Sequence, residues 1–552
     1  MNANTITNPI LRGFHPDPSI VRVGDDYYIA TSTFEWFPGV QISHSRDFIH
    51  WETLGGTLND PAILDLKGVG PSQGVWAPCL TWDQGTFYLV FTIVRSFYCN
   101  MYDTHNYLLT SKQIMGPWSA PVSLSDFGFD PSLFHDTDGR KYMVSMVTDH
   151  RIPQKYAGRI ILQEYSPSEQ RMVGPVKDIY QGDKIFLEGP HIFKRNGWYY
   201  LFSADTGTGE LHGQTILRSR SVWGPYEMYQ SPAMERTSDT EAFSILTTRH
   251  HEDYPLQKTG HADLVETQNG EWYAVHLCGR PLSSRNEADR RRFPGCRRYP
   301  LGRETAVQKI RWTGDDWLVL DNGTTLPDTK VPAPELPPCP YPEIPARDDF
   351  DRPSLAPVWQ SLRVPMNHTH ISLTARPGWL RMYGREGLAS RFTQTLIARR
   401  WTEFTFEASA CMEFHPKVFK QMAGLICMYD TDNYFYLHLT FDEDAGTCLT
   451  LLRAENRSYS YPAGILPVPA DAPLLFKTAV DHDTIRFFYS LSDEEHFVPI
   501  GAPMDCSFLS DEACEEGWFT GAMVGICCQD LTGGGVYADF DWFEYRTDSF
   551  QS

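Results

Sequence analysis

The sequence lacks the features that mark several large classes of protein. Its 12 cysteines form no C-x-x-C pair and no Cys/His spacing typical of zinc ligands, so we expect no metal site. The N-terminal residues have neither the basic nor the apolar region of a secretory signal, and no apolar run is long enough to span a bilayer. We therefore expect a soluble cytoplasmic protein with mostly free thiols and no membrane partner.

Positive charge is also scarce. The 48 Lys and Arg residues are outnumbered by 69 Asp and Glu, which gives a formal net charge of −21. Such a surface repels phosphate backbones, so nucleic acid is not expected as a partner and a neutral substrate fits better. Aromatic residues make up 13% of the chain. They suit stacking on sugar rings, but they are equally typical of a core filled with aromatic side chains.

A run of prolines divides the chain. Eight prolines lie between Pro327 and Pro345, and such segments form stiff, extended spacers. With 552 residues, the chain exceeds one ordinary domain. We predict a first domain over residues 1–325, a linker over 326–347 and a second domain over 348–552.

The first domain repeats one pattern five times. Each copy is a short polar turn followed by an aromatic-rich strand, and its D-G or N-G turns are typical of β-hairpins. The spacing of 54 to 73 residues between the anchoring tyrosines suits one four-stranded blade with its loops, and helical periodicity is weak. We predict a five-bladed β-propeller. The anchoring tyrosines are Tyr28, Tyr88, Tyr142, Tyr200 and Tyr273.

The second domain also has the pattern of β-structure. Alternating apolar and polar residues over 404–409 and 434–439 predict half-buried strands. About 200 residues of this kind favour a two-sheet β-sandwich of the jelly-roll or concanavalin-like type. The expected fold class of the whole chain is therefore all-β.

Acidic residues recur at the same place in the repeat. Eleven or twelve residues before the anchoring tyrosines stand Asp17, Asp130 and Glu188, and the two other copies have Trp76 and His261 nearby. The innermost strand of each propeller blade begins at the central axis, so these side chains are expected to converge there. A single Asp-Pro-Ser is usually a turn; the shared offset is what favours a functional site.

Carboxyl groups that converge can perform acid–base chemistry. Neighbouring charges separate their pKa values, so that one group stays protonated while another is ionised. Glycoside hydrolysis needs such a pair, and carboxyl groups roughly 6.5–9.5 Å apart leave room for the water that inverts the anomeric centre. Asp17 and Glu188 belong to the first and fourth blades, across the axis from each other, which favours the wide, inverting arrangement.

Several longer segments carry a family resemblance. Together they resemble glycoside hydrolase family 43, and within it the two-domain β-xylosidases, over essentially the whole chain. The segments are GFHPDPS at 13–19, ATSTFEWFPGV at 30–40, WAP at 76–78, EGPH at 188–191, LGRET at 301–305 and FTGA at 519–522.

The resemblance implies roles at matching positions. Asp17 would be the general base that activates water, and Glu188 the general acid that protonates the departing oxygen. Asp130 would tune the pKa of that acid and orient the sugar. Arg303 would bind sugar hydroxyls and steady the carboxylates, and His261 would be an axial histidine under the site.

Aromatic residues at further matching positions would surround the sugar. Phe34 and Trp76 resemble residues that line the pocket. Trp518 and Phe519 resemble a segment of the sandwich that caps it, although Trp518 stands where the family pattern has phenylalanine. A pocket closed in this way admits one terminal sugar, which implies action on chain ends.

The implied activity is that of an inverting exo-1,4-β-xylosidase releasing D-xylose from xylo-oligosaccharides. An α-L-arabinofuranosidase, or an enzyme with both activities, is the nearest alternative, and a carbohydrate-binding propeller without catalysis is a more distant one. The N-D-P-N-G and R-D-P patterns of fructan-cleaving enzymes are missing. No cofactor is expected; the family allows a calcium ion, which no residue pattern here indicates. By analogy with relatives, the chain is expected to form a homo-oligomer, such as a tetramer.

Overall fold

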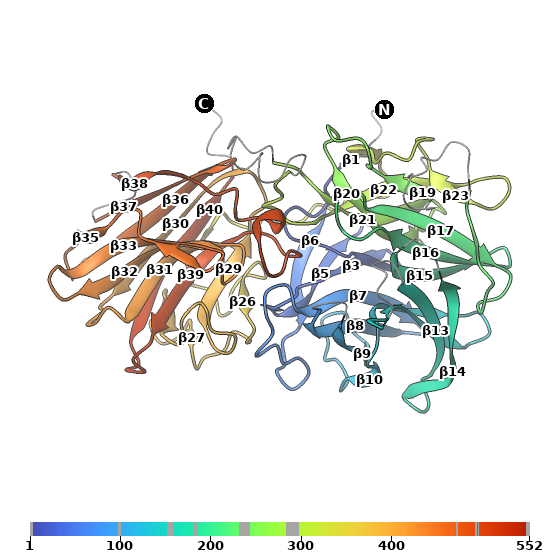
Figure 1. Ribbon diagram of the computed structural model, residues 1–552, viewed down its shortest axis with the longest axis horizontal. Coiled ribbons are helices and arrows are strands. Elements are labelled where there is room, and N and C mark those ends of the chain that lie inside the picture. Colours follow the sequence, from blue (N-terminus) through green and yellow to red (C-terminus); the bar gives the residue numbers. More distant parts are fainter. Residues whose placement is uncertain are drawn as a thin grey trace.

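A computed structural model of the chain contains two bodies, a propeller on the right of Figure 1 and a sandwich on the left. Among the described residues the only helical element is one 3-10 turn, η2 (Asp511–Ala513), and no helix there is long and apolar enough to cross a membrane. The prediction of an all-β chain is confirmed. The structure describes residues 4–97, 101–151, 158–181, 186–230, 243–282, 297–470, 473–491, 494 and 496–547.

The propeller has five blades, as the repeat predicts. Each blade is an antiparallel sheet of strands that follow one another along the chain, and each anchoring tyrosine lies on the second strand of its blade. The strands of the first three blades are β2 (Ser19–Val23), β3 (Asp26–Thr31), β5 (Gly39–Ser45) and β6 (Glu52–Leu58); β7 (Gly74–Asp83), β8 (Thr86–Ser96), β9 (Asp103–Ser111) and β10 (Val122–Ser125); β11 (Phe129–His135), β12 (Lys141–Thr148), β13 (Gly158–Ser166) and β14 (Arg171–Gln181).

The last two blades complete the ring. Their strands are β15 (Leu187–Arg195), β16 (Trp198–Asp205), β17 (Gly213–Ser219) and β18 (Glu227–Met228), with β19 (Ser244–Thr247) also on β17; and β20 (Gln257–Glu266), β21 (Trp272–Gly279), β22 (Glu304–Trp312) and β23 (Leu318–Leu320). The N-terminal segment closes the ring, because the Asn8 side chain bonds both backbone groups of Val307 on β22 and β1 (Thr5–Thr7) pairs with β24 (Lys330–Pro332).

The sandwich consists of two antiparallel sheets around one apolar core. The first sheet runs β34 (Ser458–Ser460), β33 (Gly446–Glu455), β32 (Tyr434–Asp442), β31 (Gln421–Met428), β39 (Met523–Asp530), β29 (Thr395–Arg400) and β26 (Gln360–Leu362), with β35 (Ile465–Pro467) on β33. The second runs β27 (Ile371–Ser372), β28 (Leu380–Tyr383), β40 (Tyr537–Arg546), β30 (Thr405–Phe414), β36 (Leu474–Asp481), β37 (Thr484–Ser490) and β38 (Val498–Asp505), with β25 (Arg347–Asp348) on β40.

The two bodies share backbone pairing and core. Strand β4 (Trp36–Phe37), which leaves the first blade, pairs with β26 and so extends the first sheet of the sandwich. One apolar cluster contains Phe34 and Trp36 of the propeller together with Leu362 and Met523 of the sandwich. A joint made of ladder hydrogen bonds and buried apolar surface fixes the sandwich against the propeller.

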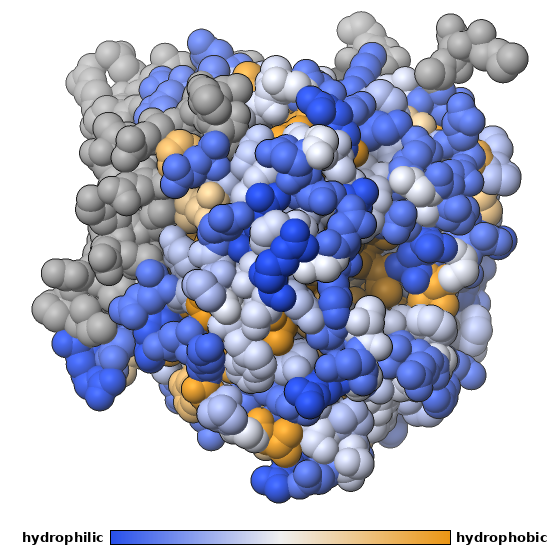
Figure 2. All heavy atoms as spheres, turned by 90° about the vertical axis from the view of Figure 1, so that its right-hand side faces the viewer, coloured by the Kyte–Doolittle hydropathy of each residue, from blue (hydrophilic) through white to orange (hydrophobic). Residues whose placement is uncertain are grey.

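The outer surface of the propeller is mostly polar (Figure 2). Seen from the propeller side in Figure 2, it is mostly hydrophilic, and hydrophobic residues form small separate patches. All ten cysteines within the described ranges are free.

Candidate active site

A left-handed backbone position recurs on the innermost strand of four blades and, in the first blade, just before that strand begins. The ladders of four blades shift register there, and the residues at the shift have positive φ angles between 35° and 53°. Left-handed backbone at a non-glycine residue costs free energy, and such positions and bulges re-aim side chains at functional sites. The equivalent residues are Asp17, Ala77, Asp130, Gly189 and His261.

This equivalence refines the sequence-based alignment of the repeats. Asp17, Asp130 and His261 occupy the left-handed position itself. In the fourth blade Gly189 occupies it, and Glu188 is the residue before. Successive side chains of an extended chain point in different directions. Glu188 therefore enters the axial site along another direction than the two aspartates.

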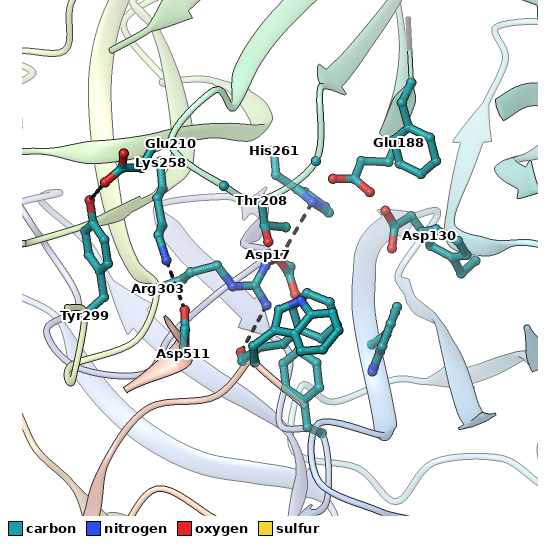
Figure 3. A pocket seen from close by; sticks show the side chains of 18 of the residues that line it. Asp17, Asp130, Glu188, Thr208, Glu210, Lys258, His261, Tyr299, Arg303 and Asp511 are labelled. Atoms are coloured by element: carbon teal, nitrogen blue, oxygen red, sulfur yellow. Dashed lines mark hydrogen bonds and ion pairs between the residues drawn. The ribbon is translucent and has the colours of Figure 1, made fainter. Parts of the chain in front are cut away.

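Asp17 is buried and its two oxygens accept different hydrogen bonds. Arg303 Nη1 donates to Oδ1 over 2.6 Å, and Ser32 Oγ donates to Oδ2 over 2.7 Å. His261 Nδ1 lies 3.7 Å from Oδ1. These contacts, some of them visible in Figure 3, give the carboxyl group one defined orientation at the propeller axis.

Glu188 is buried in a contrasting environment. Its Oε1 has no hydrogen-bond partner among the described residues. Burial, together with the charge of Asp17, raises the pKa of Glu188 to about 7, against the opposing effect of Arg303. A carboxyl group with these properties is partly protonated near neutral pH and can donate a proton.

Asp130 lies beside Glu188 and holds its backbone. The amide of Gly189 donates to Asp130 Oδ2 over 2.9 Å. Burial raises the pKa of Asp130 well above its usual value, and the charges of Glu188 and Asp17 act in the same direction. Asp130 therefore orients the peptide bond that follows Glu188, and its burial favours the neutral form of the carboxyl group.

His261 packs against the backbone on the other side of Glu188. A Cβ added at Gly189 would lie 2.9 Å from the imidazole ring, so only glycine fits beside it. Burial lowers the pKa of His261 to about 4, and Arg303 and His191 act in the same direction. The ring is thus neutral at physiological pH.

All nine residues predicted for the site line one cavity of about 640 Å³, here called the axial cavity. Eight of them are buried or partly buried, whereas Trp518 is 44% exposed and lies at the mouth. The nine are Asp17, Phe34, Trp76, Asp130, Glu188, His261, Arg303, Trp518 and Phe519.

Aromatic rings from both bodies form the wall of the axial cavity. Phe519 of the sandwich packs on two propeller rings that also contact each other, with its centroid 5.2 Å from that of Trp76 and 6.2 Å from that of Phe34. Arg303 Nη2 donates to the carbonyl of Phe519 over 3.1 Å. An apolar aromatic wall beside converging polar groups is the usual construction of a sugar pocket.

Sequence reasoning missed a second group of lining residues. They include Tyr102, Glu210, Lys258, Tyr299, Asp511 and Glu512. In Figure 3, Lys258, Asp511, Glu210 and Tyr299 lie on the side of Arg303 away from Glu188 and Asp130. Lys258 is three residues before His261 on β20, a proximity that could have indicated it. No local pattern indicates the acidic residues of η2, because they reach the cavity only through the packing of the two bodies.

Lys258 is the buried link between η2 and the propeller. Its Nζ lies 2.6 Å from Glu512 Oε1 and 3.2 Å from Asp511 Oδ2. Lys258→Met would leave two buried carboxylates uncompensated, and we expect it to lower the free energy of unfolding by about 3–5 kcal/mol. Chemical denaturation measures this loss. Lys309→Met, which breaks the partly exposed pair with Glu271, should cost less than about 1 kcal/mol; equal losses would contradict the prediction.

Metal binding gains no support from the side-chain arrangement. Among the described residues, no group of three or more His, Cys, Asp or Glu side chains is placed to hold a metal ion.

Comparisons with known proteins agree with this architecture. The family model described as "Glycosyl hydrolases family 43" matches residues 6–318, and the one described as "Beta xylosidase C-terminal Concanavalin A-like domain" matches residues 347–546. The chain is 42% identical to a "Beta-xylosidase" of Bacillus subtilis (98% of this chain, 99% of the relative) and 42% identical to "Xylosidase/arabinosidase 43B" of Humicola insolens (98% and 97%). A crystal structure of xylan β-1,4-xylosidase from Bacillus halodurans superposes with a TM-score of 0.92 at 45% identity, covering 98% of this chain and 100% of the other.

Proposed function

The chain belongs to glycoside hydrolase family 43, and on this basis we propose that it is an inverting exo-1,4-β-xylosidase that releases D-xylose from the non-reducing ends of xylo-oligosaccharides. One observation carries the proposal. Two carboxyl groups with opposite surroundings line the same cavity: Asp17, which accepts hydrogen bonds at both oxygens, and Glu188, whose pKa is raised to about 7 and whose Oε1 lacks a partner among the described residues. Such a pair supplies the base and the acid of glycoside hydrolysis.

The proposed reaction is a single displacement. Glu188 donates its proton to the glycosidic oxygen while Asp17 takes a proton from a water molecule that attacks the anomeric carbon from the opposite face. The bond between the anomeric carbon and the glycosidic oxygen breaks, and xylose leaves with α configuration. Exchange of protons with solvent then restores both carboxyl groups. Arg303 keeps the carboxylate of Asp17 in place through the reaction.

The position of the sandwich supports action at chain ends. Residues of η2 and of the segment around Phe519 line the cavity from the sandwich side, and in Figure 1 the red segment at η2 reaches toward the propeller. A long chain cannot pass through a cavity that is covered on this side. The proposed substrate is therefore a short xylo-oligosaccharide that enters with its terminal sugar first.

The stereochemistry of the product tests the proposed mechanism. We expect the xylose released from xylobiose to be the α anomer at early times, because one displacement inverts the β-linkage. Proton NMR of the anomeric region, recorded before mutarotation, measures it. Initial release of β-xylose would refute the single displacement and the role given to water.

The pKa of Glu188 predicts a pH dependence. Since the acid must be protonated, kcat/KM should fall about tenfold per pH unit above the pKa of about 7. A pH profile of kcat/KM for xylobiose measures this limb. A limb that begins only above pH 9, or the same limb in Glu188→Gln, would show that another group controls it.

A second activity has specific support. One relative at 42% identity carries the name "Xylosidase/arabinosidase 43B", which favours α-L-arabinofuranosidase activity at the same site. The ratio of kcat/KM values for 4-nitrophenyl β-D-xyloside and 4-nitrophenyl α-L-arabinofuranoside ranks the two substrates.

The homo-oligomer and the cytoplasmic location stay predictions. Light scattering coupled to size-exclusion chromatography would measure the mass of the particle in solution and so test the homo-oligomer.

A further inference from the structure

Ser72, in the loop between β6 and β7, joins three separate parts of the molecule. Its amide donates to Glu35 Oε2 over 3.0 Å, its carbonyl accepts from Trp76 Nε1 over 2.8 Å, and its Oγ accepts the amide of Phe519 over 3.0 Å. The residue is 1% exposed and its φ is 57°. A buried serine in left-handed backbone persists only where its surroundings hold it.

Two of these partners are neighbouring parts of the aromatic wall of the axial cavity. The rings of Trp76 and Phe519 come from different bodies and meet edge to face, with centroids 5.2 Å apart. Phe519 is held on both sides by the propeller, since its amide donates to Ser72 and its carbonyl accepts from Arg303. Nearby, a Cβ on Gly517 would lie 2.6 Å from the carbonyl oxygen of Pro71, so the sandwich segment approaches this loop as closely as backbone allows.

Glu35 anchors the loop from the other side. Its side chain is buried in the segment 30–40, and its carbonyl accepts the amide of Arg363 in the sandwich over 2.8 Å. Glu35 follows Phe34, which also lines the cavity. The carboxyl group of Glu35 therefore ties the loop of Ser72 to the joint between the two bodies.

We propose that Ser72, held by Glu35, is a positioning residue that fixes Trp76 and Phe519 against each other and thereby sets the shape of the aromatic wall against which the terminal sugar packs. Ser72 has no contact with the carboxyl groups of Asp17 or Glu188, so it acts on binding more than on proton transfer. This inference rests on the proposed action on terminal xylose.

Ser72→Ala tests the proposal because it removes only Oγ and leaves both backbone contacts. The amide of Phe519 then lacks its partner, and we expect KM for xylobiose to rise about tenfold while kcat changes less than about twofold. The dissociation constant of D-xylose, measured by titration calorimetry, should rise by a similar factor. This second readout does not depend on catalysis.

Two further variants separate positioning from stability. Burial raises the pKa of Glu35 to about 7; Glu35→Gln keeps an oxygen acceptor for Ser72 and should keep KM within about twofold. Ser45→Ala removes another buried Oγ that accepts a backbone amide, that of Phe48 at 3.0 Å in the first blade, and should lower thermal stability without changing KM.

The outcomes are distinct. An unchanged KM and xylose affinity in Ser72→Ala, with only a lower melting temperature, would overturn the positioning role. A wild-type protein that binds xylose but does not hydrolyse xylobiose would refute the proposed function, and the affinity of Ser72→Ala would still decide the inference. A wild-type protein that neither binds xylose nor cleaves xylobiose would overturn both.

Discussion

Replacing Glu188 by glutamine is expected to lower kcat for xylobiose by about 10²- to 10⁴-fold, the usual contribution of a general acid. The second xylose leaves xylobiose as an alkoxide unless its oxygen is protonated, and glutamine cannot supply this proton. With 4-nitrophenyl β-D-xyloside the loss should be much smaller, because 4-nitrophenolate leaves without protonation. Steady-state kinetics on both substrates therefore separates loss of the acid from general damage to the site.

Glu210→Gln is a matched control for this variant. Glu210 lines the same cavity on the side of Arg303 away from Glu188, where it accepts a hydrogen bond from Tyr299. We expect its kcat to stay within about threefold of the wild type. If Glu188→Gln lost activity equally on both substrates, or kept full activity on xylobiose, its role as the acid would be wrong. Retained xylobiose binding with lost hydrolysis would also exclude the carbohydrate-binding propeller without catalysis.

Replacing Asp17 by asparagine should lower kcat by a similar factor, about 10²- to 10⁴-fold, on both substrates. The amide cannot take the proton of the attacking water, and this need does not depend on the leaving group. The oxygen of asparagine can still accept from Arg303, so the geometry of the cavity should persist. Kinetics with xylobiose and 4-nitrophenyl β-D-xyloside measures the effect.

Azide distinguishes loss of the base from loss of structure in Asp17→Asn. As an anion it attacks without giving up a proton, so sodium azide should restore turnover of the activated substrate and form α-D-xylosyl azide. A β-configured azide would contradict the single displacement. No rescue, combined with a melting temperature far below that of the wild type, would assign the loss to misfolding.

Much of the fold could be predicted from local sequence patterns because each blade repeats the same polar turn and aromatic-rich strand. A polar turn and an aromatic strand form a hairpin wherever they occur, so Tyr28, Tyr142 and Tyr273 identify equivalent strands. The offset from these tyrosines also led to Asp17, Asp130 and His261. The one-residue difference at Glu188 was not visible, because an offset of eleven or twelve residues does not show which residue adopts the left-handed backbone.

The contribution of the sandwich to the cavity has no local signature. Ser72 and Phe519 are 447 residues apart and Lys258 and Asp511 are 253 apart. Contacts of this range depend on how two complete bodies pack, which no pattern within a strand or turn encodes. The resemblance to a family indicated Trp518 and Phe519, but neither resemblance nor pattern indicated Ser72, Lys258 or the acidic residues of η2.

The sequence by itself determined that the chain is an all-β protein with five repeats, and which acidic residues meet at their common axis, because hairpin periodicity and strand order are properties of consecutive residues. The tertiary structure decided which of those carboxyl groups keeps a proton and what covers them. Burial and charge at Glu188 depend on Asp17 and Arg303 from other blades, and the Phe519 ring that packs on Trp76 comes from the sandwich. The electrostatic environment of Glu188 and the shape of the axial cavity arise only when segments that are distant in the sequence pack against each other.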